Sequence, residues 1–150
     1  MPKKSKTFSY VHIGLFTNRP KRLINFYQAF FGFKQEKVGL IDKKTSKQIF
    51  GLSYECKMYV LALDTLRLEL FHPKSTKLKR SSRDIVGLNH WGFFVKDKHK
   101  FAEQLKKAGA RIKKIKRPSG HFVYFVSDPD NNLIEIMEPP TNLCTPRRCT

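Results

Sequence analysis

A pattern repeated along the chain constrains the fold more than any other feature. The sequence HIGLF at residues 12–16 recurs as HWGFF at 90–94. Each half then closes on a short apolar segment around a glutamate, LEL at 68–70 and IEI at 134–136. A self-similar pattern of this length indicates two copies of one supersecondary unit. It also places one histidine and one glutamate at matching positions in each half.

The first half reads as a βαβββ unit. Alternating residues predict a strand over 8–16, and Asn18 is the expected cap of a helix that has Pro20 in its first turn and stops at Gly32. Strands are predicted over 33–38, 54–63 and 65–71, the last two forming a hairpin that turns near Asp64. Residues 40–52 are expected to form an irregular, basic connection.

The second half repeats this order. The sequence predicts a strand over 88–95 and a helix capped by Asp97 that stops at Gly109. Strands follow over 111–115, 121–126 and 132–137, with a turn at 128–132. A chain of 150 residues fits one α+β domain, here 8–138, with module one at 8–73, a Ser- and Lys-rich linker at 74–86 and module two at 87–138. Residues 1–7 form a basic tail and 139–150 a polar tail.

Strand faces decide which side chains meet. Residues two apart on a strand share a face, so His12 and Phe16 lie opposite the apolar face of their strand, as His90 and Phe94 do in the repeat. Arg67 and Glu69 share the corresponding face of a later strand, and so does Glu135 in the second half. If the halves assemble symmetrically, the second faces line one cleft. A divalent cation would remove the cost of burying two carboxylates there, so the pattern predicts a metal site. Its ligands are His12, Glu69, His90 and Glu135.

Composition limits the partners and the compartment. The net charge is +18, which suits a small anionic substrate, an anionic surface or simple solvation of a Lys-rich surface. No nucleic-acid motif occurs, so nucleic acid is not an expected partner. No apolar run is long enough to span a membrane. Three cysteines without paired spacing, and the absence of a secretory signal, favour the reducing cytoplasm.

These residues resemble the vicinal oxygen chelate superfamily, which includes glyoxalase I, extradiol dioxygenases and fosfomycin and bleomycin resistance proteins. The resemblance runs from about Phe8 to Glu138, most clearly at 12–32, 87–109 and 125–135. It implies paired βαβββ modules that form a cupped mixed sheet around one divalent metal ion: Ni, Zn, Co, Fe or Mn. The cleft can form within one chain or across a homodimer.

The ligand pattern favours the glyoxalase I-like group. That group uses a His or Gln and a Glu from each half, and His12, Glu69, His90 and Glu135 fill this pattern. The resemblance therefore implies a metal-dependent lyase or isomerase acting on a small anionic oxygenated substrate, with proton transfer by Glu135 or, second, Glu69. Arg67, Phe16 and Phe94 are predicted to contact the substrate.

Two other functions remain open at this stage. A dioxygenase or antibiotic-modifying enzyme would use the same fold, but Phe125 stands where ring-cleaving relatives carry a tyrosine. A non-catalytic binder of an anionic ligand or nucleic acid would use the charge alone. Phe16 and Pro73 replace an Arg and an Asn that glutathione-handling relatives place there, so glutathione itself is not implied.

Overall fold

The chain divides into two compact units with the boundary after Arg80. The structure, a computed structural model, describes residues 11–80 and 86–139. Four predicted features lie wholly or partly outside these residues: the start of the first strand at 8–10, both tails and part of the linker. Two of the three cysteines, Cys144 and Cys149, also lie outside them. The predicted domain limits therefore stay predictions.

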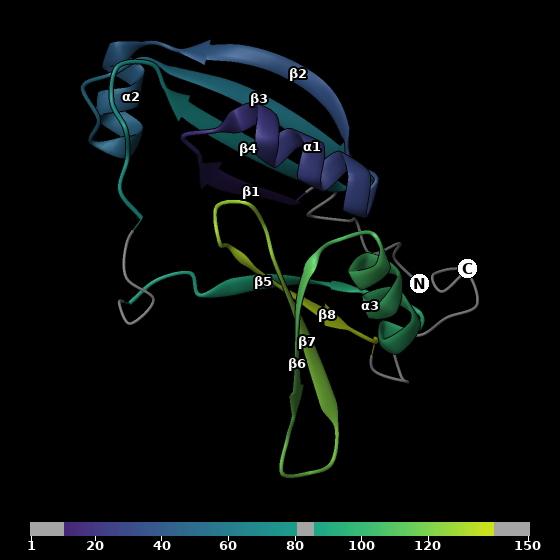
Figure 1. The fold of residues 1–150 in the computed structure, drawn as a ribbon. Coiled ribbons are helices and arrows are strands. Elements are labelled where there is room, and N and C mark those ends of the chain that lie inside the picture. The colour runs from purple at the N-terminus through teal and green to yellow at the C-terminus, as the bar shows by residue number, and fades with distance from the viewer. Residues whose placement is uncertain (1–10, 81–85, 140–150) are drawn as a thin grey trace, which may run out of the picture. The chain divides into compact units, whose positions relative to one another are not determined.

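Unit 1 contains a four-stranded mixed sheet and two helices (Figure 1). The sheet order is β1-β4-β3-β2, in which β1 is parallel to β4 and the other neighbours are antiparallel. The elements are, in chain order, β1 (Val11–Phe16), α1 (Pro20–Phe31), β2 (Lys34–Ile41), α2 (Lys43–Phe50), β3 (Cys56–Leu63) and β4 (Leu66–Pro73).

Unit 2 repeats the same topology with one helix. Its sheet order is β5-β8-β7-β6, again with one parallel pair, β5 and β8. The prediction of an α+β fold made of two βαβββ modules is therefore confirmed. The elements are β5 (His90–Phe94), α3 (Lys98–Lys107), β6 (Arg111–Lys116), β7 (Phe122–Ser127) and β8 (Leu133–Met137).

The predicted strand faces are also confirmed. In unit 1, Leu15, Leu68 and Leu70 are buried, as are Leu23 and Tyr27 of α1. In unit 2, Trp91, Ile134 and Ile136 are buried, with Ala102 and Leu105 of α3. The opposite faces keep the polar residues, with His12 and His90 exposed and Glu69 and Glu135 half-buried.

The start of α1 differs from the prediction. The residue before the helix is Arg19, and no side chain caps the end, so the assignment of Asn18 as cap is wrong. The side chain of Asn18 is used elsewhere: its amide donates to the carbonyl of Leu78 at 2.7 Å and its oxygen accepts from the Leu78 N–H at 2.9 Å. This pair of hydrogen bonds holds the segment after β4 against the turn before α1. Gly32 ends the helix as predicted, with φ of 75°.

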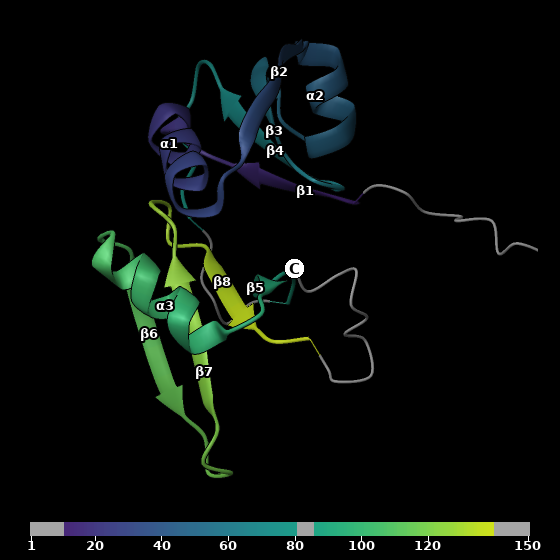
Figure 2. The ribbon, with the colours of Figure 1, turned by 90° about the vertical axis from the view of Figure 1, so that its right-hand side faces the viewer.

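The second helix of unit 1 was not predicted. Residues 43–50 of the expected irregular connection form α2, which Asp42 caps by accepting from the Thr45 N–H and hydroxyl and which ends at Gly51. The Thr45 side-chain and backbone hydrogen bonds lower the pKa of Asp42 below its ordinary value. Figure 2 shows α1 and α2 on opposite sides of the sheet, so α2 lies on the polar face.

In unit 2 the local predictions fit closely. Asp97 caps α3 by accepting from the Lys100 N–H, as expected, and the helix ends at Lys107, two residues before Gly109. The predicted turn at 128–132 forms around Asp128, which is fully buried. Its carboxylate accepts from the backbone N–H groups of Asp130 and Asn132 and from the Asn132 amide. No helix in the described residues is long and apolar enough to cross a membrane.

Candidate metal centre

His90 and Glu135 meet on one face of the unit 2 sheet. The parallel register of β5 and β8 pairs Gly92 with Glu135, and His90 lies two residues earlier on the same face. Nε2 of His90 lies 3.2 Å from Oε2 of Glu135. The side chains are 38% and 18% exposed, so both are partly accessible to solvent.

A glycine makes room for this pair. A Cβ at Gly92 would lie 2.6 Å from the Glu135 carbonyl oxygen and 3.2 Å from the Glu135 Cβ. Any larger residue would therefore push β5 away from β8 at the row that carries the carboxylate.

Two neighbours hold the imidazole of His90. Its Nδ1 lies 3.0 Å from the amide oxygen of Asn89. The ring of Phe125 stands perpendicular to it, with 5.3 Å between ring centroids. If the Nδ1 proton is donated to Asn89, the lone pair of Nε2 is available beside Glu135.

The spacing of the two donor atoms fits a shared metal ion. Neighbouring donors in a tetrahedral or octahedral site with bonds near 2.1 Å lie about 3.0–3.4 Å apart. The 3.2 Å between His90 and Glu135 falls in this range. Within residues 11–80 and 86–139, however, no group of three His, Cys, Asp or Glu side chains is close enough to hold a metal. The structure thus brings together two of the four predicted ligands.

The other two predicted ligands occupy the equivalent positions of unit 1. Gly14 pairs with Glu69 across β1 and β4, and His12 lies two residues before Gly14, as in unit 2. His12 and Glu69 do not form an ion pair in the described chain, in contrast to His90 and Glu135. The register therefore repeats while the side-chain contact does not.

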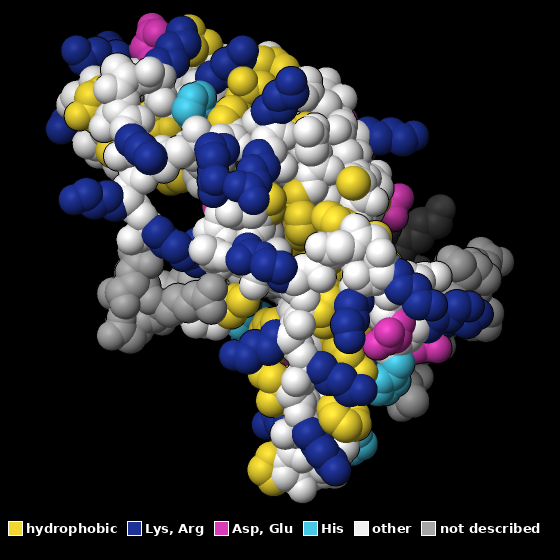
Figure 3. All heavy atoms as spheres, in the orientation of Figure 1, with side chains coloured by type: hydrophobic (Ala, Val, Ile, Leu, Met, Phe, Trp, Pro, Cys, Tyr) yellow, Lys and Arg dark blue, Asp and Glu magenta, His cyan; other side chains and the backbone are white. Residues whose placement is uncertain are grey.

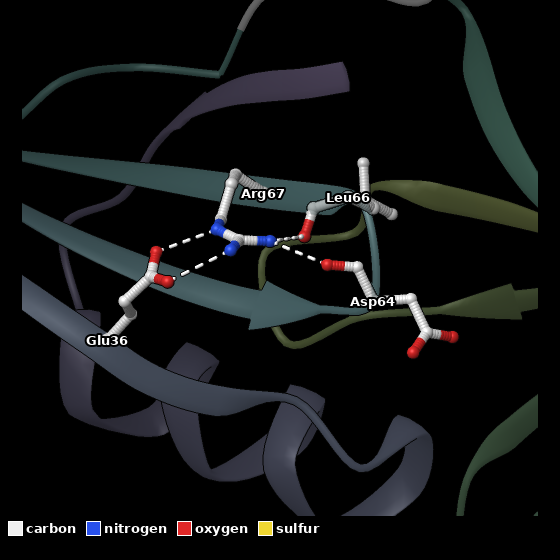
Figure 4. A network of polar contacts seen from close by, with 4 residues as sticks. All are labelled: Glu36, Asp64, Leu66 and Arg67. Atoms are coloured by element: carbon white, nitrogen blue, oxygen red, sulfur yellow. Dashed lines mark hydrogen bonds and ion pairs between the residues drawn. The ribbon is translucent and has the colours of Figure 1, made fainter. Parts of the chain in front are cut away.

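Arg67 is already occupied by a carboxylate. Its Nε and Nη2 donate to the two oxygens of Glu36 at 2.6 and 2.9 Å, and its Nη1 donates to the carbonyls of Asp64 and Leu66 (Figure 4). Such a bidentate pair largely cancels the charge of the guanidinium. The predicted role of Arg67 in binding an anionic substrate would require this pair to open.

The predicted substrate contacts Phe16 and Phe94 differ in their surroundings. Phe16 is 40% exposed and packs against Phe50 of α2 and Phe71 of β4, with centroids 5.1 and 5.9 Å away. Phe94 is 61% exposed. Neither Phe50 nor Phe71 was among the predicted substrate contacts. The alternation of β4 places Phe71 on the same face as Glu69, whereas Phe50 lies in α2, the helix that was not predicted.

Comparisons with known proteins agree with this architecture. The family model of the Glyoxalase/Bleomycin resistance protein/Dioxygenase superfamily matches residues 9–136. The chain belongs to this superfamily. Its members typically bind a divalent metal, which agrees with the donor types found at His90 and Glu135. A search of curated proteins returned no significant match.

Solved structures show the same fold at low identity. A glyoxalase family protein from Bacillus cereus is 16% identical with a TM-score of 0.67, covering 92% of this chain and 98% of that one. The trypanothione-dependent glyoxalase I of Leishmania major is 22% identical with a TM-score of 0.57, covering 85% and 84%. The fosfomycin resistance protein FosX of Listeria monocytogenes is 20% identical with a TM-score of 0.59, covering 88% and 94%. Identities this low show the fold alone.

Proposed function

We propose that the protein is a metal-dependent, glyoxalase-like lyase or isomerase that binds vicinal oxygens of a small anionic substrate. The observation that supports this most is the 3.2 Å contact between His90 and Glu135, whose register His12 and Glu69 repeat in unit 1. These four side chains are the ligands of the proposed ion, one of Ni, Zn, Co, Fe or Mn. The proposed compartment is the cytoplasm, which suits the buried, free thiol of Cys56.

The proposed ion and the residues around it would have distinct chemical roles. When bound, the ion would act as a Lewis acid on the substrate oxygens. Glu135, with Glu69 second, would take the proton from the carbon beside a carbonyl and return it to the neighbouring carbon. His90 would be held in one orientation by Asn89 and by the edge contact with Phe125.

Ring-cleaving oxygenation is the alternative reaction on this fold, and one residue argues against it. Phe125 occupies the position next to His90 where ring-cleaving relatives carry a tyrosine, and it has no hydroxyl to offer a substrate. Antibiotic modification, as in the similar FosX structures, would use the same pair. In both alternatives Glu69 would be dispensable, whereas in the proposed isomerase it is a ligand.

The test combines metal binding with turnover. The protein is loaded with each candidate metal and assayed on a 2-oxoaldehyde hemithioacetal, alongside Glu135→Gln and Glu69→Gln variants. We expect Glu135→Gln to weaken metal binding and to lower turnover by about 10²–10⁴, the usual range for losing general acid–base help. Glu69→Gln should lower turnover in the same range.

Glu138→Gln is the matched control, because this nearby carboxylate accepts from the Lys98 N–H and lies outside the pair. It should leave metal affinity and turnover unchanged. Oxygen consumption with a catechol, in wild type and in Glu69→Gln alike, would show that the protein is a dioxygenase and that the isomerase assignment is wrong.

A further inference from the structure

A row of four residues runs straight across the unit 2 sheet through the candidate metal ligand. Gly92 of β5 pairs with Glu135 of β8, Glu135 pairs with Phe125 of β7, and Phe125 pairs with Lys113 of β6. Directly paired residues project to the same face, so Lys113 shares the face of Glu135.

Unit 1 contains the same row. Gly14 pairs with Glu69, Glu69 with Val60 and Val60 with Lys37. Both halves therefore place a glycine, a glutamate, an apolar residue and a lysine side by side in that order. The motif is not visible in sequence order because its members come from four strands.

The lysine of the row is available to a ligand. Lys113 is exposed and makes no ion pair with another described residue, whereas the guanidinium of Arg67 is held by Glu36. With strands about 4.8 Å apart, the Lys113 Cα lies roughly 10 Å from the Glu135 Cα. A lysine stem packs well along an apolar side chain while its ammonium stays in water, and Phe125 lies between the two residues.

We propose that Lys113, and not Arg67, recognises the anionic group of the substrate. The inference rests on the proposed function and adds to it the position at which the anionic group of the substrate binds. The vicinal oxygens of the substrate would chelate the ion that His90 and Glu135 would hold, and the substrate carries a carboxylate or phosphate a few bonds away, across Phe125. Lys113 is a specificity residue in this arrangement, and Lys37 is its counterpart in the repeat.

The test uses two hydroxamates of equal chain length as chelating probes. Succinic monohydroxamate has an acidic tail, and butyrohydroxamate has a neutral one. Calorimetry on the metal-loaded protein should show that the acidic probe binds about tenfold more tightly, the lower end expected for a hydrogen bond to a charged group at an exposed site. Lys113→Gln should abolish this preference without changing the affinity for butyrohydroxamate, and Lys113→Arg should largely restore it.

Lys114→Gln is the matched control. It removes the same charge from the next residue of β6, which faces the other way with its ammonium 4.3 Å from the centroid of the Phe122 ring. The preference should survive in this variant. A preference that persists in Lys113→Gln, or that Lys114→Gln abolishes equally, would overturn the assignment while leaving the metal site standing. If neither hydroxamate binds a protein that holds metal, chelation of vicinal oxygens is wrong and the inference ends with it.

Discussion

At the scale of single residues, two equivalent glycines make room for different neighbours. A Cβ at Gly92 would lie 2.6 Å from a backbone oxygen of Glu135, while a Cβ at Gly14 would meet the Phe71 ring at 3.2 Å. A ring can tilt by a few tenths of an ångström, but a paired strand cannot move alone. Gly92 is therefore tied to the position of the carboxylate, and Gly14 only to aromatic packing.

This difference gives a stability prediction. We expect Gly92→Ala to lower the free energy of unfolding by about 1–3 kcal/mol, as overpacking does, and to weaken metal binding because β8 shifts. Gly14→Ala should cost less. Urea unfolding and metal titration of both variants check this, and equal losses would contradict the assigned role of Gly92.

Asn89 gives the second residue-level prediction. If its amide oxygen takes the Nδ1 proton of His90, Asn89→Ala should weaken metal binding by about tenfold, the low end of the range for outer partners of metal ligands. Asn89→Asp keeps an acceptor and should bind as wild type does. Competition with a chelator measures the affinities, and ¹⁵N shifts of the His90 ring in the metal-free protein report its tautomer. Unchanged affinity and shifts in Asn89→Ala would show that this contact is incidental.

At the scale of elements, the strands and the two long helices follow from the sequence because their signals are local. Apolar alternation fixes the faces of β4 and β8, and Gly32 marks the end of α1. The helix α2 has only eight residues, mostly polar, and Ser46 alone among them is buried, so its apolar periodicity is too weak to detect. Asn18 has the composition of a cap, yet a tertiary partner 60 residues away takes its side chain.

The candidate metal site could likewise be predicted only where the signal in the sequence is local. The identities of His90 and Glu135 follow from the repeat, but their contact depends on the parallel register of β5 and β8. The pairing of Arg67 with Glu36 was not predictable, because a register shift between Gln35 and Lys37 in β2 places Glu36 there. The pairing register of strands such as β2 and β3 cannot be predicted from a single sequence.

Strand β5 itself provides a matched pair of substitutions. Trp91 is 8% exposed and its ring lies 4.9 Å from that of Phe93, whereas Phe94, on the other face, is 61% exposed. We expect Trp91→Ala to cost about 3–5 kcal/mol of unfolding free energy, the range for removing a large buried aromatic. Phe94→Ala should cost within about 0.5 kcal/mol. Chemical denaturation measures both, and similar values would mean that the strand faces are reversed.

At the scale of the whole molecule, charge is the dominant property. The chain has 30 Lys and Arg against 12 Asp and Glu, and the basic side chains spread over much of the visible surface rather than gathering in one patch (Figure 3). A field of this kind attracts small anions and accelerates their encounter without specifying which anion is bound. Assembly as a homodimer stays a prediction.

The electrostatic field of this net charge predicts that kcat/KM for an anionic substrate depends on the salt concentration. For the metal-loaded protein, kcat/KM for a hemithioacetal of mercaptoacetate should fall several-fold between 50 and 300 mM NaCl, since the Debye length shortens to below about 10 Å. The hemithioacetal of 2-mercaptoethanol, which is neutral, should change little. Equal salt dependence of the two substrates would mean that the net charge does not serve substrate capture.

The hydrogen bonds between Asn18 and Leu78 also close a long loop of the chain inside unit 1. They join two residues that are 60 positions apart, and the loop contains α1, β2, α2, β3 and β4. Closing a loop of this length costs conformational entropy, but the pairing of β1 with β4 has already brought its two ends together. The two hydrogen bonds therefore add little to that entropic cost, and one side chain before α1 fixes the backbone of the residue that lies five positions after the end of β4.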